Sequence, residues 1–339
     1  MSDKRESVCR FISRQLKYHR QRQQQENRAL PACSPLVVAL NGPQGSGKTT
    51  LSRAVCQALQ GPSFNLKAVA VSLDDFYLTH TEQQQRYLAS GELTERLSSH
   101  CTGSAGSTLN PLLEYRGNPG THDIDLGRST LSQLIRINQT HRPVMVPRYD
   151  KAQHGGRGDR CPSDQWMQVN GPVDVVLFEG WMLGFRPLST QQLTDIHQAA
   201  QRGSALSEYR HVGKYTLGQL LTINGYLAGI EQSWYPLLDC LVALTTTHID
   251  QVYTWRLEQE HSLAQSLIPE EGAAVPKPRV LSDDQVQDFV DRFMPAYELY
   301  RPAFLASGLF PPPSQPADPC RNLFLTLNEC REVIHRREF

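Results

Sequence analysis

The stretch from Gly42 to Thr49 (GPQGSGKT) has the spacing G-x-x-x-x-G-K-[ST]. Glycines there let the backbone turn tightly, so that successive N–H groups can point at one phosphate group. Lys48 can reach the β- and γ-phosphates of a nucleotide, and the Thr49 hydroxyl can bind Mg²⁺. A glycine-rich turn that matches by chance is the alternative interpretation. The pattern predicts a site for ATP and Mg²⁺ with these binding residues: Gly42, Pro43, Gln44, Gly45, Ser46, Gly47, Lys48, Thr49 and Thr50.

Acidic residues follow two other apolar runs. Asp74 and Asp75 come directly after one run, and Glu179 closes another. The carboxyl ends of parallel strands meet at one edge of a sheet, so these acids should face the phosphate loop. A carboxylate after the first run could accept the proton of an attacking hydroxyl, hold metal, or simply cap a helix. An acid that ends an apolar strand beside a phosphate loop predicts a magnesium ligand, so we assign Glu179 to the metal together with Thr49.

Two polar segments and one helix carry further candidates. Residues 115–123 (YRGNPGTHD) are dense in donors and acceptors, which indicates ligand contact or a plain turn that caps a helix. Residues 147–160 end in a cationic, glycine-containing loop that suits an anionic substrate or the transferred phosphoryl group, or is merely solvated. The predicted helix 248–267 carries Arg256, which could fold over the phosphates as part of a lid or lie solvated on the helix surface.

Strands that alternate with helices predict an α/β protein. We expect one doubly wound, mostly parallel, five-stranded sheet with helices on both faces. The apolar helix that should follow the phosphate loop spans residues 50–59. The predicted strands are 36–40, 67–73, 143–146, 173–180 and 240–244, with 323–327 as a possible edge strand.

We predict a helical extension over residues 1–34 and a single domain over 35–339. Substrate elements should be inserted at about 79–160, and the lid helix at about 248–267. Small, polar and aperiodic residues over 98–109 predict a mobile surface loop. A further helix is expected over 284–299, where apolar residues recur at helical spacing.

Composition argues against several classes of protein. The chain of 339 residues has 34 basic and 34 acidic side chains and no basic stripe, so we expect no nucleic-acid partner. No run approaches the ~18 apolar residues of a membrane span, so we expect no membrane partner. Eight cysteines without a C-x-x-C pair indicate reduced thiols, and we expect a cytoplasmic protein. A transit peptide is the alternative for the N-terminus, which however contains acids that such peptides lack.

Eight segments of the sequence resemble motifs of a known family: GPQGSGKTT, SLDDFY, RGNPGTHD, PRYDKAQHGGRGDR, VVLFEGWMLGF, INGYLAGIEQSW, YTWRLEQE and DFVDRFMPAYELY. Together they resemble the D-glycerate 3-kinases of plants and their fungal and bacterial relatives, over residues 35–305. That family belongs to a larger group of P-loop kinases, which includes uridine kinase, phosphoribulokinase and pantothenate kinase. RGNPGTHD and the GGRGDR loop are specific to the D-glycerate 3-kinase family. The phosphate loop and the FEG motif are shared by the whole group of P-loop kinases.

The resemblance implies the fold of a P-loop NTPase kinase and ATP-dependent phosphorylation of D-glycerate to 3-phosphoglycerate. It implies Asp74 as the catalytic base, Glu179 as the metal-associated acid, and Lys48 and Arg256 as catalytic cations. Another acceptor (a nucleoside, pantothenate or a sugar acid) and a regulatory ATP-binding module are the alternatives. We expect a small-molecule acceptor and a monomer or weak homodimer. The substrate residues that the resemblance implies are Asp75, Tyr77, Arg116, His122, Asp123, Arg148, Tyr149, Arg157 and Arg160.

Overall fold

The computed structural model describes residues 2–26, 33–98, 109–202, 209–266, 281–313, 315 and 318–339. The predicted mobile loop over 98–109 lies outside these residues except for its two end positions. Of the helices in the described part of the chain, none is long and apolar enough to cross a membrane.

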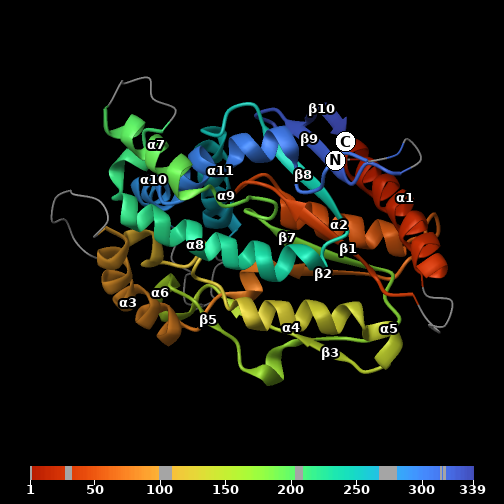
Figure 1. The fold of residues 1–339 in the computed structure, drawn as a ribbon. Helices are drawn as coiled ribbons and strands as arrows, with labels where there is room; N and C mark the ends of the chain where they lie inside the picture. Colours follow the sequence, from red (N-terminus) through yellow and green to blue (C-terminus); the bar gives the residue numbers. More distant parts are fainter. Residues whose placement is uncertain are drawn as a thin grey trace.

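A six-stranded sheet forms the centre of the molecule, in the order β10-β9-β8-β1-β7-β2 (Figure 1). Every neighbouring pair is parallel except β9 and β10, which are antiparallel. The predicted α/β class with a mostly parallel sheet is therefore confirmed. The strands are β1 (Leu36–Asn41), β2 (Ala68–Ser72), β7 (Val175–Gly180), β8 (Cys240–Thr246), β9 (Asn322–Leu327) and β10 (Val333–Glu338).

The sheet differs from the predicted one in its membership. The run 143–146 was expected inside the sheet, but β3 (Val144–Val146) pairs antiparallel with β6 (Met167–Val169) outside it. Only alternate residues of β3 are buried, which is typical of an antiparallel strand pair with one face toward the core and one toward solvent. The predicted edge strand, β9, lies inside the sheet because β10 pairs along its free side. The sequence of β10 has no apolar run that would reveal it.

Both faces of the sheet are covered, because alternate residues of each strand point to opposite sides. On β1, Leu36, Val38 and Leu40 join one apolar cluster with the helices α1 (Ser2–Glu26) and α2 (Lys48–Gln60). Val37 and Ala39 of β1 join the second cluster, which contains residues of α4 (Ile124–Ile135), α8 (Leu217–Trp234) and α11 (Met294–Ser307). Figure 1 shows β1, β7 and β8 between these helices.

The remaining helices and short strands lie outside the central sheet. The helix expected over 284–299 is two helices, because helical structure is interrupted near Phe293, and Pro295 lies in the first turn of the second helix. The remaining helices are α3 (His80–Ser98), α5 (Ile137–Thr140), α6 (Gln153–Gly156), α7 (Thr190–Gln201), α9 (Gln251–Ser266) and α10 (Asp283–Asp291), and the short strands β4 (Tyr149–Asp150) and β5 (Asp159–Arg160) form a pair.

The two ends of the described chain lie side by side (Figure 1). Helix α1 is present as expected, and its apolar residues, among them Phe11 and Ile12, are fully buried. The Lys4 ammonium donates to the Arg331 carbonyl in the turn between β9 and β10, at 2.7 Å. The division into an extension over 1–34 and a domain over 35–339 stays a prediction.

Candidate active site

The phosphate loop connects the end of β1 to the start of α2. Gly45 and Gly47 have φ angles of 73° and 82°, in the left-handed region that favours glycine. A Cβ atom on Gly45 would lie 2.5 Å from the Cβ of Trp255, so α9 packs directly on the loop. At its base, the Asn41 amide donates to two carbonyls that follow β7, at 3.0 and 2.7 Å. The loop is therefore held from both sides.

A pocket of about 1000 Å³ opens in front of this loop. Within the described ranges Lys48 makes no ion pair with a carboxylate, so its ammonium is available to a phosphate group. The walls are the loop and first turns of α2 (Gly45 to Leu51 and Ala54), three residues of α9 (Glu258, Gln259 and Ser262), the hairpin turn Cys330 to Val333, and Asp3 to Arg5 of α1.

The two predicted metal residues lie together. Glu179 lies next to the last residue of β7 and is buried, and the Thr49 hydroxyl donates to its Oε1 atom at 2.8 Å. No cluster of three or more His, Cys, Asp or Glu that could hold a metal occurs in the described chain. Mg²⁺ in kinase sites takes one or two carboxylates and completes its shell with phosphates and water. This oxygen pair beside the phosphate loop therefore fits Mg²⁺ bound together with a nucleotide.

Asp74 lies in the short turn after β2 and is held by two donors. The Tyr77 hydroxyl donates to Oδ1 at 2.9 Å, and the Lys151 ammonium to Oδ2 at 2.5 Å. Burial raises the pKa of Asp74, but the charges of Lys151 and Lys48 outweigh burial and bring the pKa well below its ordinary value. Asp74 is therefore an ionised carboxylate within reach of the Lys48 charge.

Asp75 has the opposite electrostatic character. Its Oδ1 atom accepts a hydrogen bond from the Tyr149 backbone N–H at 3.3 Å. Burial raises the pKa of Asp75 to about 6, and the neighbouring Asp74 charge contributes to the increase. Two adjacent carboxyls thus differ widely in acidity. Burial also raises the pKa of the Tyr149 hydroxyl to about 12, so that group stays protonated.

Arg116 and Arg160 tie the polar segments together. The Arg116 guanidinium donates to two carbonyls of the 147–160 segment, at 2.7 and 2.5 Å. The Arg160 guanidinium donates to the Tyr77 carbonyl at 2.8 Å and to the Asp123 carboxylate at 3.1 Å. These arginines position the loops that carry Lys151 and Tyr149 beside Asp74.

The other two arginines predicted on the substrate side, Arg148 and Arg157, are exposed. Arg157 stacks on the Tyr115 ring with 4.7 Å between guanidinium and ring centre, and it approaches Glu114 at 3.5 Å. The Arg148 side chain is exposed and makes no hydrogen bond or ion pair with any residue in the described ranges.

His122 and Asp123 lie directly before α4. The Asp123 side chain accepts the Leu126 N–H at 3.0 Å, so the predicted alternative of a helix cap applies to this residue. His122 is 2% exposed, and both of its ring nitrogens lack a hydrogen-bond partner in the described structure. Its ring lies 4.5 Å from the Tyr77 ring. Burial lowers the pKa of His122 to about 3, so the imidazole is neutral.

Arg256 projects from α9 onto its own helix and onto α10. It pairs with Glu260 one turn later and stacks on the Phe289 ring at 5.1 Å. Burial lowers the pKa of Arg256, Glu260 raises it, and the Arg116 charge lowers it. Arg256 therefore lies near the cation that organises the polar segments.

The chain is similar to one family model and to several known kinases. The model of the ATPase family associated with various cellular activities (AAA) matches residues 38–96, from β1 into α3. The chain is 35% identical over 300 residues to the chloroplastic D-glycerate 3-kinase of Arabidopsis thaliana, which covers 88% of this chain and 54% of that protein. It is 33% identical over 307 residues to the probable ATP-dependent kinase TDA10 of Saccharomyces cerevisiae, covering 88% of this chain and 90% of that one.

A solved structure extends the likeness to the whole fold. The D-glycerate 3-kinase from Cryptococcus neoformans superposes with a TM-score of 0.78 at 32% identity, covering 99% of both chains. This chain belongs to the D-glycerate 3-kinase family. As a member it is an ATP-dependent kinase with a P-loop fold. It spans about half the length of the Arabidopsis relative.

The family motifs did not reveal every residue that organises this site. Lys151 stands in the cationic loop after β4, but nothing local indicates that it pairs with Asp74, 77 positions earlier. Tyr297 of α11 donates to the Gln44 side chain in the phosphate loop. Arg331 donates to the Gly45 carbonyl from the β9–β10 turn, beyond the segments that resemble the family.

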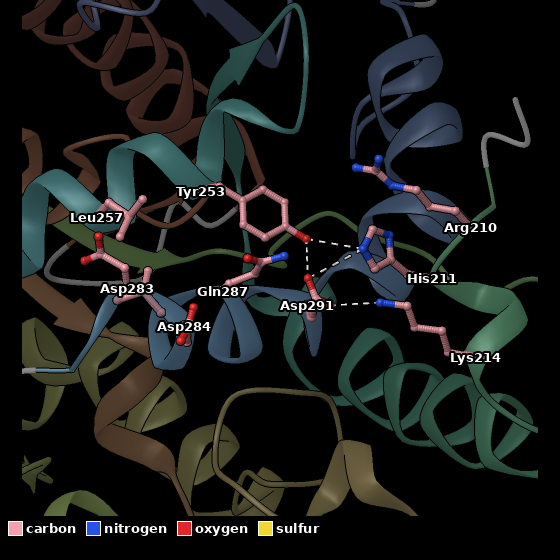
Figure 2. A pocket seen from close by; sticks show the side chains of 10 residues that line it. Arg210, His211, Lys214, Tyr253, Leu257, Asp283, Asp284, Gln287 and Asp291 are labelled. Carbon is pink, nitrogen blue, oxygen red and sulfur yellow. Dashed lines mark hydrogen bonds and ion pairs between the residues drawn. The ribbon is translucent and has the colours of Figure 1, made fainter. Parts of the chain in front are cut away.

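A second pocket of this family member lies on the other side of α9 (Figure 2). Its volume is about 510 Å³, and none of the predicted site residues lines it. Figure 2 shows Asp291 at its centre, bonded to the Tyr253 hydroxyl at 2.5 Å and to the Lys214 ammonium at 2.8 Å. His211 lies 3.2 Å from the same hydroxyl. This polar network anchors α9 to α10 and is separate from the phosphate loop.

Proposed function

We propose that this kinase transfers the γ-phosphoryl group of ATP to the primary hydroxyl of D-glycerate and so forms 3-phosphoglycerate. The observation that carries the proposal is the Asp74 carboxylate, which lies close enough to Lys48 for that charge to lower its pKa. An alcohol at this carboxylate would face a phosphate bound by Lys48, as in-line transfer requires. Two relatives named D-glycerate 3-kinase support the choice of acceptor.

The nucleotide would be bound by backbone amides of the phosphate loop, the N-terminus of α2 and the Lys48 ammonium. Thr49 and Glu179 would hold Mg²⁺, which supplies positive charge to the phosphates when bound. Arg256 would have to exchange its Glu260 partner for phosphate oxygen to act as a lid cation. Each of these groups acts by position and charge rather than by covalent chemistry.

The acceptor would bind where the polar segments meet Asp74. Because the pKa of Asp74 is low, its carboxylate is a weak base that orients the hydroxyl and receives the proton late in the transfer. Lys151, which neutralises Asp74, would also attract the carboxylate of glycerate. We further propose that the acceptor side consists of residues that either contact the acceptor or hold and border the loops around it, each from its place in the polar segments: Asp75, Tyr77, Arg116, His122, Asp123, Arg148, Tyr149, Arg157 and Arg160.

An acceptor panel tests this function. The purified protein is incubated with ATP and Mg²⁺ plus D-glycerate, L-glycerate, uridine, pantothenate or gluconate, and ADP release is followed against a reaction without acceptor. We expect release with D-glycerate well above that background, and phosphorus NMR should identify 3-phosphoglycerate. An unchanged rate with D-glycerate would contradict the proposed acceptor. ATP hydrolysis that ignores every acceptor would favour a regulatory module.

We also propose a monomer or weak homodimer that acts in the cytoplasm. Light scattering of the purified chain over a range of concentrations measures the first property, and a tetramer or larger assembly would contradict it. Cell fractionation measures the second.

A further inference from the structure

The turn between β9 and β10 forms one wall of the phosphate-loop pocket. Its backbone is closed by hydrogen bonds from Asn328 N to Glu332 O and from Arg331 N to Asn328 O, both at 2.9 Å. Arg331 has a φ of 61°, a conformation that residues with a Cβ atom adopt only where the surrounding structure supports it. The turn is therefore a defined element, and it presents the Arg331 side chain to the pocket.

One guanidinium links three parts of the pocket. Arg331 Nε donates to the Gly45 carbonyl at 2.7 Å, inside the phosphate loop. Its Nη2 atom lies 3.4 Å from the Trp255 carbonyl, and its Nη1 atom pairs with Glu258 at 2.7 Å, both on α9. The Trp255 indole in turn donates to the Glu329 carbonyl at 2.7 Å. The phosphate loop, α9 and the β9–β10 turn are thus bonded into one unit.

The contact with Gly45 matters for the shape of the loop. The Gly45 carbonyl and the Ser46 N–H belong to one rigid peptide plane. The Ser46 N–H donates to the Pro43 carbonyl at 3.2 Å, and the carbonyl end is held by Arg331. With both ends fixed, this peptide cannot rotate, and the amides that follow it keep one direction. Trp255 packs directly against Gly45, where an added Cβ atom would lie 2.5 Å from the Trp255 Cβ.

We propose that Arg331 is a positioning residue for the nucleotide site, which fixes the phosphate loop against α9 before ATP binds. The inference rests on the proposed binding of ATP at this loop. A loop without the Arg331 contact would have to be ordered at the moment of binding, which lowers affinity for the nucleotide. The acceptor side has no contact with Arg331 in the described structure, so affinity for the acceptor should not change.

Five proteins test this role: the parent, Arg331→Ala, Arg331→Lys, Glu258→Gln and the control Arg336→Ala. Arg336 lies on the same hairpin but pairs with Glu338, away from the loop. The dissociation constant of ADP is measured by calorimetry, the KM for ATP and for D-glycerate by steady-state kinetics, and the fold by thermal unfolding. Loss of a charge-assisted hydrogen bond predicts about tenfold weaker ADP binding or more in Arg331→Ala, with a matching rise in the KM for ATP.

The KM for D-glycerate should stay within about twofold of the parent value, which a general loosening of the protein would not allow. Arg331→Lys keeps a cation for Glu258 but cannot bond both carbonyls in the same geometry, so we expect an intermediate loss. Arg336→Ala should bind ADP like the parent. Glu258→Gln, which leaves the Gly45 contact intact, should lose less than Arg331→Ala.

Parental ADP affinity in Arg331→Ala, or an equal rise in both KM values, would overturn the inference. If Arg331→Ala does not fold, Arg331→Lys decides, because parental ADP affinity in that variant would overturn it equally. Failure of the parent itself to bind ADP would remove the proposed function and this inference together. Binding by the parent with unaltered variants would remove only the inference.

Discussion

The phosphate loop and the proposed acceptor side are built in opposite ways, although both begin at the carboxyl ends of strands of the same sheet. The loop is a continuous segment from Gly42 to Thr49, completed by one acid from β7. The acceptor side joins distant segments through Lys151 with Asp74 and Arg160 with Asp123, 77 and 37 positions apart. The phosphate-binding loop is formed by the local backbone conformation of one segment, whereas the proposed acceptor pocket is held together by ion pairs between distant segments.

The two sides also differ in how their cations are used. Lys48 has no carboxylate partner in the described parts of the chain, while Lys151 and Arg160 are both paired with acids. An unpaired ammonium is ready for an incoming phosphate at no cost in broken contacts. A paired cation holds the pocket in shape and must share its charge with any acceptor. The two halves should therefore respond differently to mutation.

The largest effect is expected from Lys48→Ala. Loss of the ammonium should reduce kcat by about a hundredfold or more and weaken ADP binding, because phosphate charge is no longer neutralised. Kinetics and calorimetry measure the two effects, and exposed Lys17 on α1 offers a matched Lys→Ala control. Parental ADP affinity in Lys48→Ala would show that nucleotide binding at the phosphate loop does not depend on the Lys48 ammonium.

Asp74→Asn should separate the two sides. The amide keeps the shape of the carboxylate but cannot accept the proton, so kcat should fall by about a hundredfold or more. ADP binding should stay at the parental level, since the loop is unchanged. Exposed Asp195 on α7 provides the Asp→Asn control. Phosphorylation at the parental rate would disprove the assignment of Asp74 as base.

The same contrast explains what could be predicted from the sequence. Strand, glycine loop and helix are adjacent in the chain, and the strand-end rule correctly placed Asp74 and Glu179 near the loop. The pairing of Lys151 with Asp74 and of Arg331 with Gly45 depends on tertiary contacts that leave no local pattern. β3 was assigned to the wrong sheet because a short apolar run does not say which strand it pairs with.

A moderate, pH-dependent effect is expected at Asp75, whose pKa is raised to about 6. Protonation as the pH falls through 6 weakens its bond to the Tyr149 N–H and loosens the loop that carries Lys151. We expect kcat/KM for D-glycerate to fall several-fold between pH 7.5 and 5 in the parent. Asp75→Asn should stay near the low value at every pH in this range. An unaltered pH profile in Asp75→Asn would assign the titration to another group.

The raised pKa of Asp75 should also appear in the pH dependence of thermal stability, and its direction can be stated. A carboxyl whose pKa is higher in the folded than in the unfolded state stabilises the fold below its unfolded pKa, and that gain is lost as the pH rises through 6. The unfolding midpoint of Asp75→Asn relative to the parent should therefore increase from pH 5 to pH 7.5. A constant difference would contradict the raised pKa.

The smallest effect is expected at Arg148, and it is best measured beside Arg116. Arg116 holds the 147–160 segment through two carbonyls, so Arg116→Ala should raise the KM for D-glycerate by about tenfold through loss of a charge-assisted anchor. The Arg148 side chain is exposed and makes no hydrogen bond or ion pair within the described ranges, so Arg148→Ala should change that KM by less than about twofold. If Arg148→Ala instead matched Arg116→Ala, its guanidinium would have to reach the acceptor directly. The acceptor pocket would then depend on an unpaired cation, as the phosphate side does, and the contrast between the two halves would fail.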